Sequence, residues 1–482
     1  MHRITTQTLY SKSYSKAFRI SSWISVISRM TILFIPSFIY NNFTREWSPN
    51  SKPGPTAYLD GMRGLASLFV FFCHLFYTSF KVAEGWGHDD HYEIWKLPFL
   101  RLLFAGPSMV CVFFVISGYA LSLKPMKQIR SRSFEGLSNT MISFIFRRGF
   151  RLFIPPMIST FMVMVLLRLG AYEWTRSFAE NKTYMKNVLE WHPPRMDTTL
   201  GQLENWGGEM YNFVHIWSWE KYGGSTGYDV HLWTIPVEYR CSMMLFLIIL
   251  GTARLRTGIR FLCLGGIMLF VLRSDRWEMV LFLSGMILAE LDVMRGAHIP
   301  PAMAPTTSVL PLDEISNPRP KKANSLLSFL LAILALYLMS CPDSESGQTP
   351  GWKMLALFVP EWFTEQYRFW QMIGSILFVA CVARSPRWQS VFNTDIVQYF
   401  GRISYAIYLV HGPVLHTAGY AIERWAWGIT GTDGWAYNTG FIVAAFFNIG
   451  LVIWAADVFW RVVDAPTVRF AKWLESNWFI SD

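Results

Sequence analysis

Two ionisable residues, Arg63 and His74, lie in one apolar stretch that reads YLDGMRGLASLFVFFCHL from residue 58. They are eleven positions apart, so on a helix they fall within about 20° of the same side, about 16 Å apart along the axis. Asp60, one turn before Arg63, can pair with it. Ionisable groups inside apolar segments normally face water or a protein interior. We therefore expect Arg63 and His74 to face one cavity at two depths.

The chemistry that His74 can perform depends on what surrounds it. A neutral imidazole can accept a proton as a general base, act as a nucleophile, bind a metal ion, or donate a hydrogen bond to a neighbouring helix. The position that His74 shares with Arg63 favours a functional role over a purely structural hydrogen bond.

A pair of arginines opens a later apolar stretch, FRRGFRLFIPP. Arg148 and Arg151 are three positions apart, so both guanidinium groups can point at one anion, and paired guanidinium groups suit phosphate. Arginines at the edge of an apolar segment also serve as ordinary topology anchors. The pair is consistent with either role.

The stretch HLWTIPVEYR contains His231 and Glu238, seven positions apart, which is two turns on one face of a helix. A bare carboxylate is costly in an apolar context, so Glu238 needs a partner. An imidazole in a general-base pair and an arginine in a structural ion pair both satisfy that need. His411, in GRISYAIYLVHG, is equally consistent with helix packing and with a site.

Several kinds of site lack a signature in this chain. The sequence has no zinc-ligand spacing, no phosphate-binding glycine loop and no G-x-S-x-G turn. The six cysteines are scattered without a C-x-x-C pair, which indicates packing rather than redox chemistry. We therefore expect no metal ion.

Composition places the chain among membrane proteins. Apolar residues make up 52% of the 482 residues and charged residues only 16%. The net charge of +10 is spread over short segments between apolar stretches, so it indicates membrane topology rather than a nucleic-acid partner.

The apolar stretches predict an all-α, polytopic fold with about ten transmembrane helices. Basic segments precede the first span and follow the second, fourth, sixth, eighth and tenth, which predicts that both termini are cytoplasmic. The spans are expected at 58–80, 97–123, 149–169, 231–251, 258–273, 277–291, 325–341, 367–384, 399–420 and 437–460.

The remaining segments give the expected organisation of the chain. A basic N-terminal extension, 1–57, precedes the transmembrane domain, 58–460, and contains either an interfacial helix or an eleventh crossing. Residues 170–230 form a non-cytoplasmic loop with a sequon at Asn181. A Pro-rich cytoplasmic linker, 292–324, lies between spans 6 and 7, and a cytoplasmic tail occupies 461–482. We expect an integral protein of an endomembrane (ER or Golgi) or the plasma membrane.

Five sequence blocks resemble the acyltransferase-3 membrane proteins. In that family an arginine, ten residues and a histidine occur in the first core helix, matched here by Arg63 and His74. The resemblance continues in FFVISGYALS, in Arg148 and Arg151, in HLWTIPVEYR and in GRISYAIYLVHGPV, in that order over roughly residues 58 to 460. The N-terminal extension and the aromatic loop are similar to those of filamentous-fungal members.

The resemblance implies an O-acyltransferase that moves an acyl group, often acetyl, from cytoplasmic acyl-CoA to a hydroxyl of a carbohydrate or small metabolite. His74 would be the general base, and Arg63 would stabilise the thioester oxyanion or hold the phosphopantetheine arm. Glu238 is the third candidate catalytic residue. The residues expected to hold acyl-CoA are Arg148, Arg151, Tyr119 and Ser117.

Other interpretations of the same residues stay open. An acyl-histidine intermediate is the alternative to direct transfer. A proton-coupled or anion transporter could use Arg63, His74 and Glu238 as its path. An interaction protein could bind a partner through the aromatic loop.

Overall fold

The computed structural model describes residues 34–37, 39, 54–216, 224–297 and 325–480. Regular structure in these residues is helical, with two isolated β-bridges outside the helices. The all-α prediction is confirmed. Most of the predicted N-terminal extension and residues 298–324 of the predicted linker lie outside the described residues, so the boundaries proposed there stay predictions.

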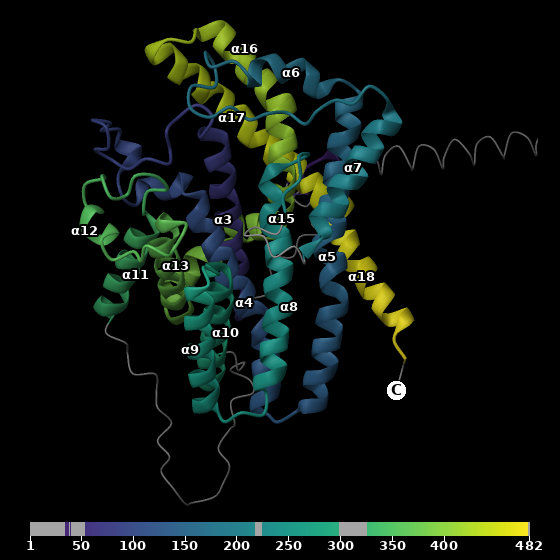
Figure 1. Ribbon diagram of the computed structural model, residues 1–482, viewed down its shortest axis with the longest axis vertical. Coiled ribbons are helices and arrows are strands. Elements are labelled where there is room, and N and C mark those ends of the chain that lie inside the picture. Colours follow the sequence, from purple (N-terminus) through teal and green to yellow (C-terminus); the bar gives the residue numbers. More distant parts are fainter. Residues whose placement is uncertain (1–33, 38, 40–53, 217–223, 298–324, 481–482) are drawn as a thin grey trace, which may run out of the picture.

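Each of the ten predicted spans corresponds to a helix (Figure 1). Boundaries differ by several residues, most of all where the third predicted span proves to be the C-terminal half of a 35-residue helix. The ten helices are α3 (Ala57–Phe76), α4 (Gly106–Arg130), α5 (Phe134–Arg168), α8 (Thr234–Thr252), α9 (Thr257–Arg273), α10 (Trp277–Met294), α11 (Ser325–Met339), α13 (Gln366–Arg384), α15 (Asp395–Val414) and α17 (Gly434–Phe459).

Several helices are suited to cross a bilayer, whose apolar core of about 30 Å needs about 20 helical residues. Among the described residues, five helices are long and apolar enough, and a sixth is counted if α13 and the short helix after it, bent by 101°, form one span. The chain is therefore an integral, multi-pass membrane protein. The five are Ala57–Phe76, Gly106–Arg130, Phe134–Arg168, Val230–Thr252 and Gly434–Trp478.

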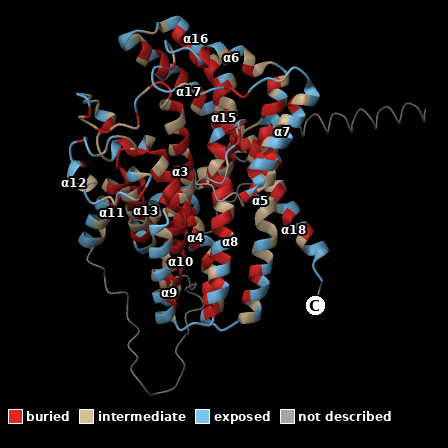
Figure 2. Cartoon of the chain, in the orientation of Figure 1, coloured by how far each residue is buried: buried red, intermediate tan, exposed pale blue. Residues whose placement is uncertain are grey.

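Helix α3 packs closely against α15. A Cβ added to Gly64 of α3 would lie 2.4 Å from the backbone nitrogen of Gly401, and one added to Gly401 would lie 2.6 Å from the carbonyl oxygen of Asp60. Only glycine on both helices allows this approach. Buried residues gather along the middle of the bundle, where α3, α4, α10 and α15 pack (Figure 2). The two helices that carry Arg63, His74 and His411 are thus held rigidly together.

Shorter helices close the two ends of the bundle. Residues of the predicted non-cytoplasmic loop form α6 (Ala171–Ala179) and α7 (Thr199–Val214), and α6 lies with α16 (Tyr420–Thr430) at one end (Figure 1). The predicted tail is helical from η7 (Trp460–Asp464) through α18 (Ala465–Trp478). It packs against α5, where Glu475 lies 2.9 Å from Arg147.

The other described elements are short. They are η1 (Ile94–Lys96), η2 (Leu100–Phe104), η4 (Val230–Trp233), α12 (Lys353–Ala356), α14 (Pro386–Phe392) and η6 (Leu415–Gly419).

Candidate active site

A cavity of about 970 Å³, called here the cationic cavity, opens where the N-terminal turns of α3 meet α4, α5, α8 and α15. Eight of its lining residues are Lys or Arg, and three are Asp or Glu. Such an excess of positive charge suits a ligand with several negative charges. The cavity is lined by five of the seven predicted site residues: Arg63, Ser117, Arg148, Arg151 and Glu238.

Glu238 sits in the wall of this cavity as the partner of an arginine. Its Oε1 lies 2.7 Å from Nη2 of Arg148 and accepts a hydrogen bond from the Ser117 hydroxyl at 3.1 Å. Arg148 also donates through Nε to the Ser242 hydroxyl at 3.0 Å. Of the two partners left open by the sequence, an arginine is the one that Glu238 has.

His231 and Glu238 have separate ion-pair partners: Asp229 and Glu190 for His231, and Arg148 for Glu238. His231 lies in the 3₁₀ turn η4, and the α-helix begins only at Thr234. The segment is therefore not one continuous α-helix, for which the spacing of seven was interpreted.

The structure also places the predicted residues Arg63 and Tyr119. Arg63 Nη1 lies 3.5 Å from Asp60, as the spacing predicted. Tyr119 is fully buried and donates its hydroxyl hydrogen bond to Asp292 on α10 at 2.8 Å. It lines neither the cationic cavity nor the smaller cavity described below.

The C-terminal part of the chain completes the cationic cavity with residues that the sequence did not single out. Their positive charge had been assigned to membrane topology alone, and nothing in the sequence shows that α18 folds back against α5. They are Arg402, Arg461, Arg469 and Lys472.

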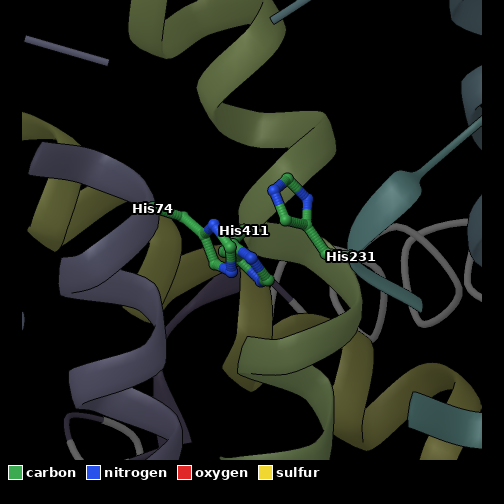
Figure 3. A group of neighbouring side chains, drawn as sticks. All are labelled: His74, His231 and His411. Carbon is green, nitrogen blue, oxygen red and sulfur yellow. The ribbon is translucent and has the colours of Figure 1, made fainter. Parts of the chain in front are cut away.

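Three histidines meet deeper in the bundle and form what we call the histidine cluster: His74 of α3, His231 of η4 and His411 of α15 (Figure 3). The ring centroids of His74 and His231 are 3.9 Å apart, and those of His74 and His411 are 5.2 Å apart. The sequence singled out all three residues but assigned a catalytic role only to His74.

Two ring nitrogens of the histidine cluster, one on His74 and one on His411, are available to accept a proton. His411 Nδ1 lies 3.0 Å from the Ile407 carbonyl, so it must donate, and in the neutral ring Nε2 carries the lone pair. Among the residues that the structure describes, neither His411 Nε2 nor His74 Nδ1 has a hydrogen-bond partner, and both atoms are buried. Buried polar atoms are rarely left so, and those that are commonly mark reactive sites.

His231 is fixed by two carboxylates. Its Nδ1 lies 3.0 Å from Asp229, and its Nε2 lies 2.9 Å from Oε1 of Glu190. The other oxygen of Glu190 lies 3.0 Å from Nε2 of His416. Burial alone would raise the pKa of the Glu190 carboxyl, but the imidazoles of His231 and His416 outweigh it and hold that pKa well below its usual range. Glu190 comes from the loop, and its sequence context gave no signal.

The histidine cluster could also hold a metal ion, because one nitrogen from each ring lies within 4.8 Å of the others. Imidazole nitrogens are common ligands of zinc, copper and iron. The sequence showed no ligand spacing because the three histidines come from separate elements.

A second cavity of about 280 Å³, the smaller cavity, opens beside the histidine cluster. His231, Glu190 and His416 line it, as does Tyr77, which follows the C-terminal end of α3. Arg63 in the cationic cavity and Tyr77 in the smaller one are fourteen residues apart, about 21 Å along a helix. The two cavities therefore lie at opposite ends of α3. Arg63 lines the cationic cavity, whereas His74 lines neither and lies near the smaller one, so the one cavity predicted for both residues is not what these two cavities provide.

Comparison with known proteins identifies the family of the chain. Residues 56–457 match the Acyltransferase domain family, Acyl_transf_3. The O-acetyltransferase PaAT-1 of Phomopsis amygdali is 32% identical over 433 residues, covering 87% of this chain and 84% of that protein. No solved structure matches the chain.

Two further fungal relatives are more distant. Acyltransferase R4 of a Phoma species is 27% identical over 456 residues, covering 86% of this chain and 94% of that protein. Acyltransferase clz18 of Cochliobolus lunatus is 25% identical over 459 residues, covering 87% and 95%. The match to the family extends over most of the chain and includes the three histidines and the arginines at 63, 148 and 151, so the chain is an acyltransferase of the acyltransferase-3 family.

Proposed function

We propose that the protein is a membrane-bound O-acyltransferase that moves an acetyl group from acetyl-CoA to a hydroxyl of a carbohydrate or small metabolite, with His74 as general base. The observation that carries the proposal is that one helix, α3, places Arg63 in the cationic cavity and His74 in the histidine cluster. The similarity to an O-acetyltransferase supports the choice of acetyl and of an oxygen acceptor.

The cationic cavity is the proposed donor site. Coenzyme A carries several phosphate charges, and the guanidinium groups of Arg148 and Arg151 suit phosphate oxygens. Arg63 holds the phosphopantetheine arm or the thioester oxygen, and the Ser117 hydroxyl lies in the same wall. Tyr119 is left out of this site because its hydroxyl is directed to Asp292.

The reaction needs one base and no change of oxidation state. His74 takes the proton of the acceptor hydroxyl as its oxygen attacks the thioester carbon. The carbon–sulfur bond breaks, an ester bond forms, and the His74 imidazolium returns the proton to the departing thiolate. His411 Nε2 and His231 lie within contact of His74 and share the positioning of the reacting groups.

Glu238 acts in this proposal as the counter-ion of Arg148. The ion pair holds the guanidinium in the cavity wall when no donor is bound. Its role is therefore electrostatic, at the donor site, and separate from proton transfer at His74.

The proposed membrane topology is the one that the sequence predicts, with ten crossings and both termini in the cytoplasm. The cationic cavity then opens to the cytoplasm, where acetyl-CoA is made, and residues 170–230 lie on the other side. Asn181 of the sequon is exposed. Protein made in a eukaryotic host should lose the mass of one glycan on treatment with an endoglycosidase. Asn181→Gln should abolish that shift. An unglycosylated Asn181 would argue against the proposed orientation.

The direct test is acetyl transfer by the purified, detergent-solubilised protein from radiolabelled acetyl-CoA. His74→Gln should lower turnover by about 10²- to 10⁴-fold, the usual worth of a general base. The matched control is His215→Gln, because His215 is exposed at the end of α7 and lines neither cavity. Full activity in His74→Gln would place the base elsewhere.

A single-turnover experiment separates the two mechanisms. With donor but no acceptor, direct transfer leaves no label on the protein. Label that survives denaturation in wild type and disappears in His74→Gln would replace direct transfer with an acyl-histidine intermediate.

A further inference from the structure

The smaller cavity is built mainly from the loop that precedes α8. Nine of its fourteen lining residues come from residues 172–230, and the others are His231 of η4, Tyr77 after α3, and three residues where α15 passes into η6. It reaches His231, whose ring lies 3.9 Å from that of His74. A molecule in this cavity is therefore one side chain away from the proposed base.

The chemistry of the lining is specific. Aromatic rings dominate it: Tyr77, Tyr172, Trp191 and Tyr228. Leucine, valine and two prolines add further apolar surface, and no Lys or Arg lies among the described residues that line it. A phosphate or carboxylate would find no lysine or arginine among these residues and would meet the carboxylates of Asp229 and Glu190.

Both carboxylates in the lining are already engaged by imidazoles. Asp229 holds His231 through Nδ1 at 3.0 Å, and Glu190 bridges His231 and His416 at 2.9 and 3.0 Å. Tyr420 also donates to Glu190 at 3.3 Å. These ion pairs and hydrogen bonds engage both carboxylates within the wall, and the other lining side chains are mainly rings and aliphatic carbon.

Resting on the function proposed above, we infer that the smaller cavity is the acceptor site and takes an uncharged, largely apolar alcohol. The aromatic rings pack against the body of the acceptor, and its hydroxyl points past His231 to His74. Glu190 is a positioning residue, because it holds His231 and His416 in fixed orientations without reaching the acceptor's reacting oxygen.

The acceptor class is tested by the release of CoA thiol from wild-type protein with acetyl-CoA and one probe alcohol at a time. Menthol and 2-phenylethanol represent apolar alcohols, and glucose and glucose 6-phosphate represent polar and anionic ones. Menthol or 2-phenylethanol should raise CoA release above the rate without acceptor, and the two sugars should not. Greater stimulation by either sugar, or no effect of the apolar alcohols, would overturn the acceptor class.

The site itself is tested with Trp191→Ala. Trp191 lines the cavity and is 70% exposed, so its loss leaves the core intact. We expect the KM for the apolar alcohol to rise about fivefold or more, with the KM for acetyl-CoA within twofold. Trp174→Ala is the matched control, since Trp174 is 66% exposed on α6 and does not line the cavity. Equal effects of the two variants would refute the site.

Glu190→Gln tests positioning because it keeps the shape and removes the charge. We expect kcat to fall about tenfold or more while both KM values stay within twofold. A merely structural role would instead lower the amount of folded protein without changing kcat per folded molecule, and that result would contradict the assignment.

Failure of this inference can be told from failure of the proposed function. Equilibrium binding of acetyl-CoA, and its weakening by Arg148→Gln, depend on the cationic cavity alone. If both are observed and the acceptor tests fail, the donor site stands and the acceptor site lies elsewhere.

Discussion

The pairing of Arg148 with Glu238 allows a sharp test of the donor site. Replacing Arg148 by Gln removes a charged donor to phosphate, and a hydrogen bond to a charged group is worth about 1.5–3 kcal/mol. The expected loss is therefore about 10- to 150-fold in acetyl-CoA affinity. The same change leaves the Glu238 carboxylate, formerly 2.7 Å from the guanidinium, unpaired in the cavity wall.

A second variant separates these two contributions. The freed carboxylate repels the donor's phosphates, so Arg148→Gln with Glu238→Gln should bind acetyl-CoA more tightly than Arg148→Gln alone. The pair is partly exposed, with side-chain accessibilities of 11% and 23%, so its loss should cost less than the 3–5 kcal/mol of a fully buried pair. We expect about 1–3 kcal/mol of folding stability to be lost in the single variant and most of it to be regained in the double variant.

The assay is equilibrium binding of radiolabelled acetyl-CoA at one fixed salt concentration, together with thermal unfolding of each variant. Arg130→Gln is the control, because Arg130 is exposed at the end of α4 and does not line the cavity. The reasoning is refuted if Arg148→Gln binds as tightly as wild type, or if removing Glu238 from it weakens binding further.

Two further predictions concern stability. Gly64→Ala should lower the free energy of unfolding by about 1–3 kcal/mol in a thermal or denaturant melt, since the new Cβ would lie 2.4 Å from the Gly401 backbone. Gly251→Ala, which meets nothing within 4 Å, should be neutral or stabilising by up to about 1 kcal/mol, and equal losses would contradict the close packing of α3 on α15. Burial raises the pKa of the Glu423 carboxyl to about 8, so the folded protein holds a proton that the unfolded chain releases above its ordinary pKa of 4.5. Stability should therefore fall as pH rises from about 5 to 8, and Glu423→Gln should flatten that slope in melts across this range; an unchanged slope would refute it.

The positions of the helices could be predicted from the sequence because an apolar stretch of about 20 residues has the length and composition of a helix that crosses a bilayer. Arg63 with Asp60, and the arginines before the third span, were likewise found from local spacing, which a continuous helix preserves. How many of the helices cross the membrane depends on lipid and on neighbouring helices as well, so ten crossings remain a prediction.

Contacts between distant segments could not be predicted in the same way. The histidine cluster joins residues 74, 231 and 411, and nothing in their local sequences states that α3 and α15 cross at paired glycines. Glu190 reaches His231 and His416 only because the loop folds back over the bundle. Tyr119 was placed in the donor site by its neighbours in sequence, whereas its hydroxyl bonds to Asp292 on another helix.

The proposed reaction requires acetyl-CoA to reach from the cationic cavity to the imidazole of His74, which lies about 16 Å further along α3 than Arg63. The most direct test is a cryo-electron microscopy structure with a non-hydrolysable acetyl-CoA analogue. We expect the phosphates to lie against Arg148 and Arg151, and the acetyl carbon to lie beside the His74 ring. An acetyl group lodged away from the histidine cluster, with the phosphates outside the cationic cavity, would contradict it.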